Sequence, residues 1–194
     1  MQMNTQERFL IKMNRIITYS IIIGLCFFIS YISVNGTNAI AQRDSVGNIS
    51  YKLPDTWNAV ESEKQFRLLE ITLNTNEDFS LVLFSNIQGT ADQNIERWIN
   101  QFKKDDFFNQ ENIIIKRDSL DNKYITLLEM YGNYEVPNMG NLSQEKTLKN
   151  NYGLLGGVIE FPNSFYFVKA VGLNSAISSN KDNFERFIYS IRLN

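Results

Sequence analysis

Three pairs of apolar segments with strand-like composition follow one another along the chain, and each pair is joined by a short polar turn. The pairs are residues 67–73 with 79–84, residues 113–117 with 124–131, and residues 152–161 with 165–171. Their connections are rich in Asn, Asp, Ser and Pro, which favour turns. Because strands joined by such short connections pair antiparallel, this order predicts an antiparallel sheet. The alternating residues 49–53 predict one further strand before it.

Two segments carry the spacing of amphipathic helices, with apolar residues at i, i+3, i+4 and i+7. The apolar positions are Ile95, Trp98, Ile99 and Phe102 in the first segment and Phe184, Phe187, Ile188 and Ile191 in the second. Asp92 is the predicted N-cap of the first helix, and Ser179 with Asp182 predicts a capping box at the second. Burial of each large apolar side chain contributes roughly 1.5 to 3 kcal/mol, so both helices are expected to dock on the sheet. The predicted fold class is α+β, an antiparallel β-sheet of about six strands sandwiched by amphipathic helices.

The N-terminal part of the chain has the three-part pattern of a secretory signal peptide. Lys12 and Arg15 precede the apolar residues 21–34, and residues 39–41 form an Ala-Ile-Ala site. This order predicts cleavage directly after residue 41. The alternative is an uncleaved membrane anchor, because residues 16–34 nearly reach the ~20 apolar residues that span a bilayer.

The signal-peptide pattern divides the chain into three parts. Residues 1–41 are the predicted signal peptide, residues 42–48 a short N-terminal segment, and residues 49–194 a single α+β domain. The only cysteine, Cys26, lies in the apolar run, so the processed chain would contain neither a thiol nor a disulfide. A chain of this size buries ~68 to 70% of its unfolded surface, which suffices without cross-links. We expect an exported protein in the periplasm or another exocytoplasmic compartment.

Several classes of chemistry are excluded by composition, because the 194 residues include no histidine. Ser-His-Asp and Cys-His nucleophile activation, imidazole bases and histidine-containing zinc sites are therefore absent. The chain has 19 Lys and Arg against 21 Asp and Glu, and its longest basic runs are dipeptides. That balance gives no sign of nucleic-acid binding. We also expect no membrane span once the signal is removed.

Two further segments lack an obvious periodic role. Residues 153–157 (Gly-Leu-Leu-Gly-Gly) lie in a strand pattern, where they predict a bulge or a close backbone approach rather than a phosphate cradle. Residues 136–151 predict a long surface loop between two strands. Loops longer than ~12 to 15 residues are often functional, and a tolerated insertion is the alternative interpretation.

Several segments of the sequence together resemble a group of exported bacterial proteins with the PsbP-like fold. The matching segments are residues 51–57, 67–70, 89–102, 132–134, 154–160, 165–169 and 184–191. The most specific of them is the Asn-Ile-Glu-Arg-Trp-Ile-x-x-Phe pattern at residues 94–102. The resemblance extends from about residue 50 to residue 192.

The resemblance implies an antiparallel sheet sandwiched by helices, the fold of the extrinsic photosystem II subunit PsbP and of a small Ran-binding nuclear-import factor. These relatives are accessory or interaction proteins rather than catalysts, although a fold alone does not transfer a function. The association of PsbP with a manganese and calcium cluster draws partly on histidine. Because this chain has no histidine, we expect no cofactor.

Four polar residues form the candidate binding site. Asn94 and Arg97 lie on the first predicted helix, and Arg67 and Glu129 lie on predicted strands. A guanidinium group in a partly enclosed cleft can bind a carboxylate or a phosphate with two parallel hydrogen bonds. The alternative is structural, an ion pair of Arg97 with Glu70 or Glu129 that fixes the helix to the sheet.

The sequence therefore predicts an exported, non-catalytic accessory or binding module whose partner is a protein or a small ligand. The alternative function is a carboxylate-based hydrolase or a divalent-cation-binding protein, because two carboxylates suffice for glycosidase-like chemistry. Nothing in the sequence singles out such a pair. Asn74, Asn76 and Asp78 alternate but lack the glycine and terminal glutamate of an EF-hand loop. The sequence does not predict an oligomeric state.

Overall fold

The computed structural model describes residues 13, 17–23, 25–26, 43–75, 77–104, 110–136 and 147–194. The chain divides into two compact units, Met1–Gln42 and Arg43–Asn194. The described residues of the first unit are helical, and Cys26 among them is a free thiol. No helix within the described ranges has the length and hydropathy needed to cross a membrane. The predicted basic flank and cleavage site lie outside the described residues.

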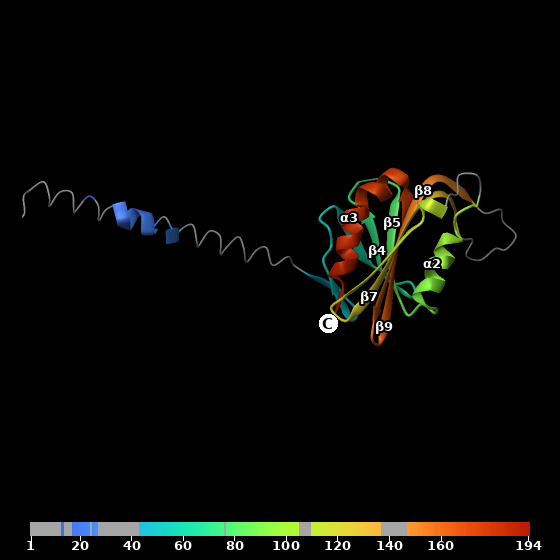
Figure 1. The fold of residues 1–194 in the computed structure, drawn as a ribbon, viewed down its shortest axis with the longest axis horizontal. Coiled ribbons are helices and arrows are strands. Elements are labelled where there is room, and N and C mark those ends of the chain that lie inside the picture. The colour runs from blue at the N-terminus through green and yellow to red at the C-terminus, as the bar shows by residue number, and fades with distance from the viewer. Residues whose placement is uncertain are drawn as a thin grey trace, which may run out of the picture. The chain divides into compact units, whose positions relative to one another are not determined.

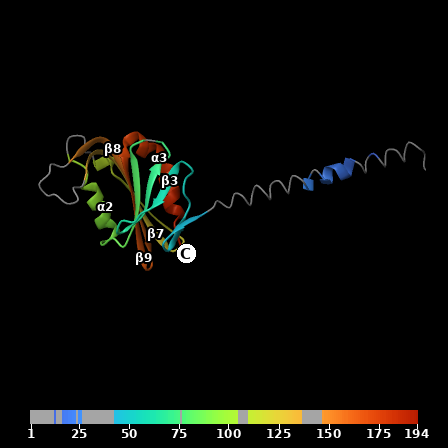
Figure 2. The same cartoon turned by 180° about the vertical axis from the view of Figure 1, so that it is seen from behind.

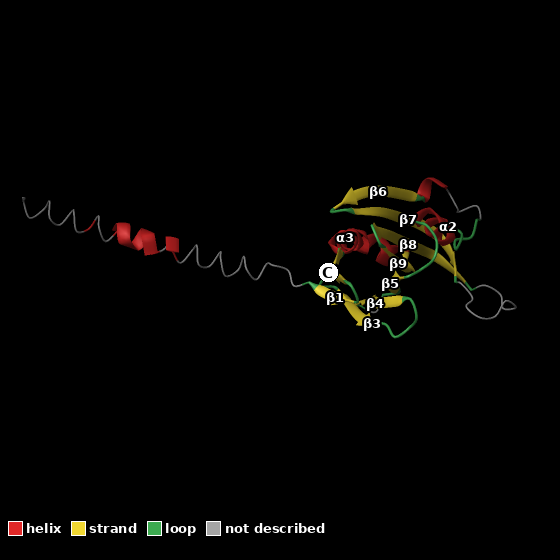
Figure 3. Cartoon of the chain, turned by 90° about the horizontal axis from the view of Figure 1, so that it is seen from below, coloured by secondary structure: helices red, strands yellow, loops and turns green. Residues whose placement is uncertain are grey.

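The second unit is built on a seven-stranded sheet in which all neighbouring strands are antiparallel. The strand order is β3-β4-β5-β9-β8-β7-β6, and Figure 3 shows the strands following one another in this order. The strands are β3 (Trp57–Glu61), β4 (Arg67–Leu73), β5 (Phe79–Ser85), β6 (Ile114–Leu120), β7 (Lys123–Glu135), β8 (Leu148–Phe161) and β9 (Ser164–Leu173). A smaller sheet has the order β1-β2-β10, formed by β1 (Asp44–Val46), β2 (Ile49–Tyr51) and β10 (Arg192–Leu193).

The three predicted hairpins are confirmed as the pairs β4/β5, β6/β7 and β8/β9. Pairing of β5 with β9 and of β7 with β8 joins the hairpins into one sheet. The sequence interpretation missed β3, because residues 54–57 read as a turn whereas Trp57 already begins a strand. Strand β2, predicted from residues 49–53, belongs to the smaller sheet. The predicted loop at 136–151 is shorter than expected, since β8 begins at Leu148; residues 137–146 lie outside the described residues.

Helix α2 (Ala91–Ile99) begins one residue before Asp92, the predicted N-cap. Thr90 is the N-cap, and its hydroxyl accepts a hydrogen bond from the Gln93 backbone N–H at 3.2 Å. The Gln93 side-chain oxygen accepts in return from the Thr90 N–H at 3.0 Å, which completes a capping box. The prediction of Asp92 as N-cap is wrong because this reciprocal pair satisfies the first free amides of the helix. A short 3-10 helix, η1 (Gln110–Asn112), follows α2.

Helix α3 (Asn174–Ser190) begins earlier than the sequence predicted. It continues directly from β9, with Leu173 as an N-cap that makes no side-chain hydrogen bond. The predicted capping box at Ser179 and Asp182 is therefore wrong, because both residues lie inside the helix. The Ser179 hydroxyl instead donates to the carbonyl oxygen of Ala176, one turn earlier, at 3.1 Å.

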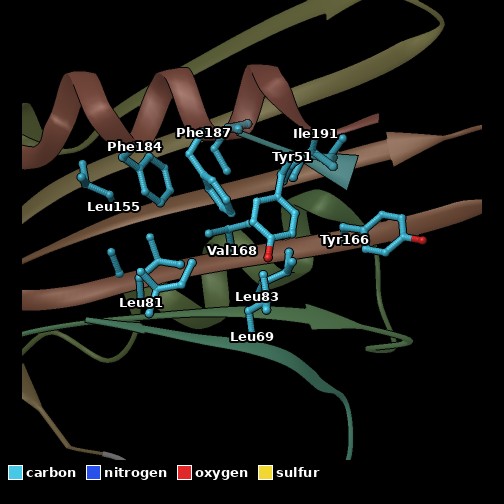
Figure 4. Close-up of a cluster of buried hydrophobic side chains, with 14 of the residues drawn as sticks. Tyr51, Leu69, Leu81, Leu83, Leu155, Tyr166, Val168, Phe184, Phe187 and Ile191 are labelled. Atoms are coloured by element: carbon cyan, nitrogen blue, oxygen red, sulfur yellow. The ribbon is translucent and has the colours of Figure 1, made fainter. Parts of the chain in front are cut away.

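The two helices cover opposite faces of the large sheet, as Figures 1 and 2 show. Helix α3 and the smaller sheet pack on one face through a cluster that includes Tyr51, Phe184 and Phe187, which Figure 4 shows beside α3. Helix α2 packs on the other face through a second cluster that includes Trp98 and Phe167. The predicted layer arrangement, a sheet sandwiched by amphipathic helices, is confirmed.

Two adjacent glycines in β8 let the helices approach the sheet from both sides. A Cβ atom on Gly156 would lie 2.6 Å from the Trp98 ring of α2, and one on Gly157 would lie 2.6 Å from Ile188 of α3. Successive residues of a strand point to opposite faces, so each glycine serves one helix. The predicted close backbone approach in residues 153–157 is confirmed, and it is made by helix side chains.

Candidate functional site

A cavity lies between α2 and the sheet face that this helix covers, and we call it the α2 cavity. Its volume is about 510 Å³, within the ~300 to 1,000 Å³ typical of ligand pockets. Its apolar lining residues are Val82, Phe84, Ile87, Trp98, Val136 and Val171. Its polar lining residues are Arg67, Asp78, Ser80, Asn94, Arg97, Gln101, Tyr134, Lys149, Tyr152 and Lys169. The cavity thus combines an apolar wall with four basic side chains and one carboxylate.

Three of the four predicted site residues line the α2 cavity together. Arg67 reaches it from β4, and Asn94 and Arg97 reach it from α2. Glu129 is the exception, because it lies on the α3 side of the sheet, where Oε2 is 2.6 Å from the Lys181 ammonium group. The Tyr131 hydroxyl donates a second contact to Glu129 at 3.0 Å.

The position of Glu129 follows from strand alternation in β7. Its two neighbours, Leu128 and Met130, are buried in the cluster beneath α2. Because side chains alternate between the faces of a strand, Glu129 must point toward α3. There the hydrogen bond with Glu129 raises the pKa of Lys181. The pKa of Tyr131 is raised to about 12, mainly by burial and then by the charge of Glu129.

Arg67 is held at one side of the α2 cavity by a carboxylate and an aromatic ring. Its Nη1 lies 3.0 Å from Oε1 of Glu70, and its guanidinium carbon lies 5.9 Å from the centre of the Phe84 ring. Lys64 also contacts Glu70 at 3.0 Å. Hydrogen bonds from Lys64 first, then Arg67 and Ser62, lower the pKa of Glu70 to about 2. The charge of Arg67 is therefore compensated within the protein.

Arg97 has a different environment, because its neighbour is an amide rather than a carboxylate. Its Nη1 donates to Oδ1 of Asn94 at 3.0 Å, and Asn94 in turn donates to the Thr90 carbonyl at 2.9 Å. Asn94 is only 2% exposed, so it holds Arg97 from within the helix packing. The predicted pairing of Arg97 with Glu70 or Glu129 is wrong, since both carboxylates contact other cations. Within the described part of the chain, Arg97 forms no salt bridge.

Lys169 of β9 is the cavity residue that the sequence interpretation missed. Its ammonium group donates to the side-chain oxygen of Gln101 and to the Tyr134 hydroxyl, the latter at 3.1 Å. It also lies 5.2 Å from the centre of the Tyr134 ring. None of the described carboxylates forms a salt bridge with it. Burial without a compensating charge lowers the pKa of Lys169 to about 8.

A pattern in the sequence could have identified Lys169. It is the one charged residue in the otherwise apolar strand β9, between Val168 and Ala170. Alternation places it on the same face as Phe167 and Val171, which pack beneath α2. A lysine on a buried strand face usually marks either a hidden partner or a site.

Among the described residues, Asp78 is the one carboxylate that lines the α2 cavity, and it is already paired. Asp78 accepts hydrogen bonds from the Tyr152 hydroxyl and from Lys149, the latter at 3.4 Å. Lys149 also donates to the Tyr152 hydroxyl at 3.1 Å, which is the largest cause of the raised pKa of Lys149. Glu70 thus pairs with Arg67, and Asp78 pairs with Lys149. Among the described residues, no carboxylate compensates the charges of Arg97 and Lys169.

A second cavity, of about 560 Å³, lies near the C-terminus and is lined by residues that include Lys123, Phe161 and Arg192. Lys123 is only 1% exposed. Its ammonium group donates to the carbonyl oxygens of Tyr189 and Ile191 at 2.9 and 2.6 Å. Cations stabilise the free carbonyls at the end of a helix. Lys123 is thus part of the attachment of α3. The two other charged residues that line this cavity in the described ranges, Asp121 and Arg192, form an ion pair at 3.5 Å.

The described ranges contain no metal-binding cluster, that is, no group of three or more Cys, Asp or Glu side chains that could hold a metal ion. The α2 cavity itself contributes one carboxylate, Asp78.

Comparison with known proteins gives a structural match only. No protein-family model matches the sequence, and no curated protein matches it either. Among solved structures, the chain is similar to the solution structure of cyanobacterial PsbP (CyanoP) from Synechocystis sp. PCC 6803, with a TM-score of 0.50. The match covers 80% of this chain and 94% of CyanoP at 15% sequence identity. The chain has a PsbP-like fold.

The PsbP-like fold predicted from the sequence is therefore confirmed, as is the α+β class. At 15% identity the likeness concerns the fold alone, so it carries no ligand or partner to this chain. Support for a ligand must therefore come from the residues of the α2 cavity.

Proposed function

We propose that this chain is an exported accessory module that binds a ligand or a partner segment in the α2 cavity without transforming it. The observation that carries the proposal is the position of Lys169, which is half-buried in a cavity of about 510 Å³ and forms no salt bridge with any described carboxylate. A buried cation without a counter-charge destabilises a fold, and such local conflicts are typical of functional sites. A bound group that supplied the counter-charge would relieve the conflict.

Two features support an accessory role over catalysis. The chain has no histidine, and its one cysteine, Cys26, lies in the predicted signal peptide. The resemblance of residues 94–102 to exported PsbP-like proteins points in the same direction, because those relatives assist other proteins. Export rests on the basic flank, apolar run and Ala-Ile-Ala site of residues 12–41.

The carboxylate-based hydrolase or divalent-cation protein remains the second candidate, and the α2 cavity gives it little support. Glycoside hydrolysis needs two carboxyl groups facing each other across the scissile bond. Asp78 is the one carboxylate among the cavity residues that the structure describes, and both Tyr152 and Lys149 donate to it. A cation would also meet the like charges of Arg97 and Lys169 there.

Export is tested with the full chain carrying a C-terminal tag in a bacterium that fractionates cleanly. We expect the tagged protein in the exocytoplasmic fraction, with a mass that corresponds to cleavage after residue 41. Retention of the full-length chain in the membrane fraction would instead show an uncleaved anchor, and recovery in the cytoplasm would contradict export.

Binding is tested by pull-down from the exocytoplasmic extract of the source cell, using the same tagged chain. Ser80 is exposed and lines the cavity, so Ser80→Trp should fill it without disturbing the core. Ser119→Trp, on the exposed strand β6, adds the same side chain far from the cavity and serves as the control. We expect capture by the wild type and the control, and loss with Ser80→Trp. Equal capture by all three would contradict a role for the cavity.

A further inference from the structure

We propose that the α2 cavity binds an organic monocarboxylate with an apolar body, whose carboxylate lies between Lys169 and Arg97. This inference rests on the proposed function, because it names the class of ligand for the same site. The apolar body would lie against Trp98 and the strand residues beside it. The charges of the cavity, its hydrogen-bond donors and its apolar wall each support this class of ligand.

The charges that line the cavity favour an anionic head group. Of the four cations lining the cavity, Arg67 contacts Glu70 and Lys149 contacts Asp78. Arg97 and Lys169 form no ion pair with any described carboxylate. Both line the α2 cavity from facing elements, Arg97 from α2 and Lys169 from β9. An anion placed there would gain a guanidinium and an ammonium as charge-assisted donors.

The donor set fits a carboxylate better than a phosphate. Phosphate sites commonly use the free backbone amides at the N-terminus of a helix. The amide end of α2 is already capped by Thr90 and Gln93, and Arg97 and Gln101 bring the opposite end of α2 to the cavity. That end carries partial negative charge, which disfavours a doubly charged head group. This repulsion grows with the charge of the head group, so it is smaller for a carboxylate than for a phosphate dianion.

Lys169 adds the second reason for a small, singly charged head. Its ammonium group already donates to Gln101 and Tyr134, so one of its three hydrogens remains for a ligand. Arg97 uses Nη1 for Asn94, which leaves the rest of its planar fork for a carboxylate oxygen pair. Together these donors match the two oxygens of one carboxylate.

The apolar wall of the cavity suits an apolar ligand body. Val82, Phe84 and Val171 project from the sheet into the cavity, and Trp98 faces them from α2. Specific small-molecule sites are mostly apolar, with a few polar groups that fix the orientation. The wall would cover the apolar body of the ligand, whereas water still reaches the head group, because Arg97 is exposed and Lys169 is half-buried. A hydrocarbon chain or an aromatic ring of modest size fits about 510 Å³.

The test measures the affinity of the full chain for three probes that share one tail, octanoate, octanamide and octyl phosphate, by titration calorimetry at pH 7. Trp98 fluorescence, compared with a Trp98→Phe variant, reports whether the probe enters the cavity. We expect octanoate to bind at least tenfold more tightly than neutral octanamide and more tightly than octyl phosphate. Lys169→Met and Arg97→Gln should each reduce the octanoate preference at least fivefold. Lys116→Gln, which changes an exposed cation paired with Glu185, is the matched control and should leave it unchanged.

The outcomes separate this inference from the proposed function. Equal affinity for octanoate and octanamide, or a preference for octyl phosphate, would overturn the carboxylate inference while the cavity remained a binding site. If no probe binds but Ser80→Trp still abolishes capture of a partner, the carboxylate inference fails and the proposed function stands. If no probe binds and Ser80→Trp has no effect on capture, both fail. Melting temperatures of all variants, measured alongside, identify any that does not fold, and Arg97→Gln then serves in place of Lys169→Met.

Discussion

Replacing Lys169 by methionine is expected to make the protein more stable at neutral pH. The folded state holds the pKa of this lysine at about 8, against an ordinary value of 10.5, because burial disfavours its charged form. At about 1.36 kcal/mol per pH unit, the charged lysine lowers the free energy of unfolding by about 3 kcal/mol at pH 7. Methionine has a similar length and no charge, so Lys169→Met should recover most of that amount.

The same reasoning fixes the pH dependence. Between pH 8 and 10.5 the unfolded chain binds a proton at this lysine that the folded chain has lost, so wild-type stability rises with pH. The penalty, about 3 kcal/mol at pH 7, should fall to about 1 kcal/mol at pH 9.5. Lys123, whose pKa burial also lowers, contributes with the same sign in both proteins and cancels in their difference. The raised pKa of buried tyrosines such as Tyr131 acts in the opposite direction at higher pH, so the comparison stops at pH 9.5.

Urea denaturation of both proteins at pH 7 and pH 9.5 measures this difference. Lys116→Met, at an exposed ion pair with Glu185, is the matched control and should change stability by less than about 1 kcal/mol at either pH. A Lys169→Met variant that is less stable than the wild type at pH 7, with a gap independent of pH, would refute the reasoning. It would show that the contacts of Lys169 with Gln101 and Tyr134 outweigh the loss of hydration.

Substitutions at four further positions test the packing and the site. Trp98→Ala removes a side chain buried beneath α2 and should cost ~3 to 5 kcal/mol, seen as a lower urea midpoint; an unchanged midpoint would contradict its place in the core. Gly156→Ala puts a Cβ atom 2.6 Å from the Trp98 ring and should cost ~1 to 3 kcal/mol, measured in the same way. Thr90→Ala removes the N-cap of α2 and should cost about 1 kcal/mol by thermal denaturation, whereas Thr90→Ser should restore the stability. Glu129→Gln breaks the contact with Lys181 and should leave octanoate affinity within about twofold of the wild type, because Glu129 lies on the other face of the sheet.

The local elements of the fold could be predicted because their signals are local. Short polar turns specify hairpins, so β4/β5, β6/β7 and β8/β9 follow from the sequence. The stripe of Ile95, Trp98 and Phe102 likewise specifies the buried face of α2. The order in which the hairpins join is different, because it depends on pairings between segments far apart in the sequence. Nothing in β5 alone indicates that it pairs with β9.

The ends of the helices were predicted less well, for a physical reason. Thr90 and Asp92 are both good N-cap residues, and only the reciprocal bond with Gln93 decides between them. Helix α3 has no capping side chain at all, since it continues from β9. Ser179 has the residue type of an N-cap, but it lies well inside the helix.

The candidate site was predicted in part. Arg67, Asn94 and Arg97 do line one cavity, as the spacing of α2 and the strand pattern imply. Glu129 could have been placed on the other face by strict alternation with Leu128, which is apolar and buried beneath α2. The isolation of Lys169 could not have been predicted, because it depends on which carboxylates reach the cavity. Asp78 reaches it but contacts Lys149 and Tyr152 instead.

The central claim is that Lys169 is the uncompensated cation that a ligand carboxylate neutralises, and its own titration tests the claim most directly. Heteronuclear NMR of ¹⁵N-lysine-labelled full chain, with Lys169→Met for assignment, measures the pKa of this side chain with and without saturating octanoate. We predict a pKa of about 8 in the free protein and a rise toward 10.5 when octanoate is bound. A pKa near 10.5 in the free protein, or one that octanoate does not change, would contradict the account.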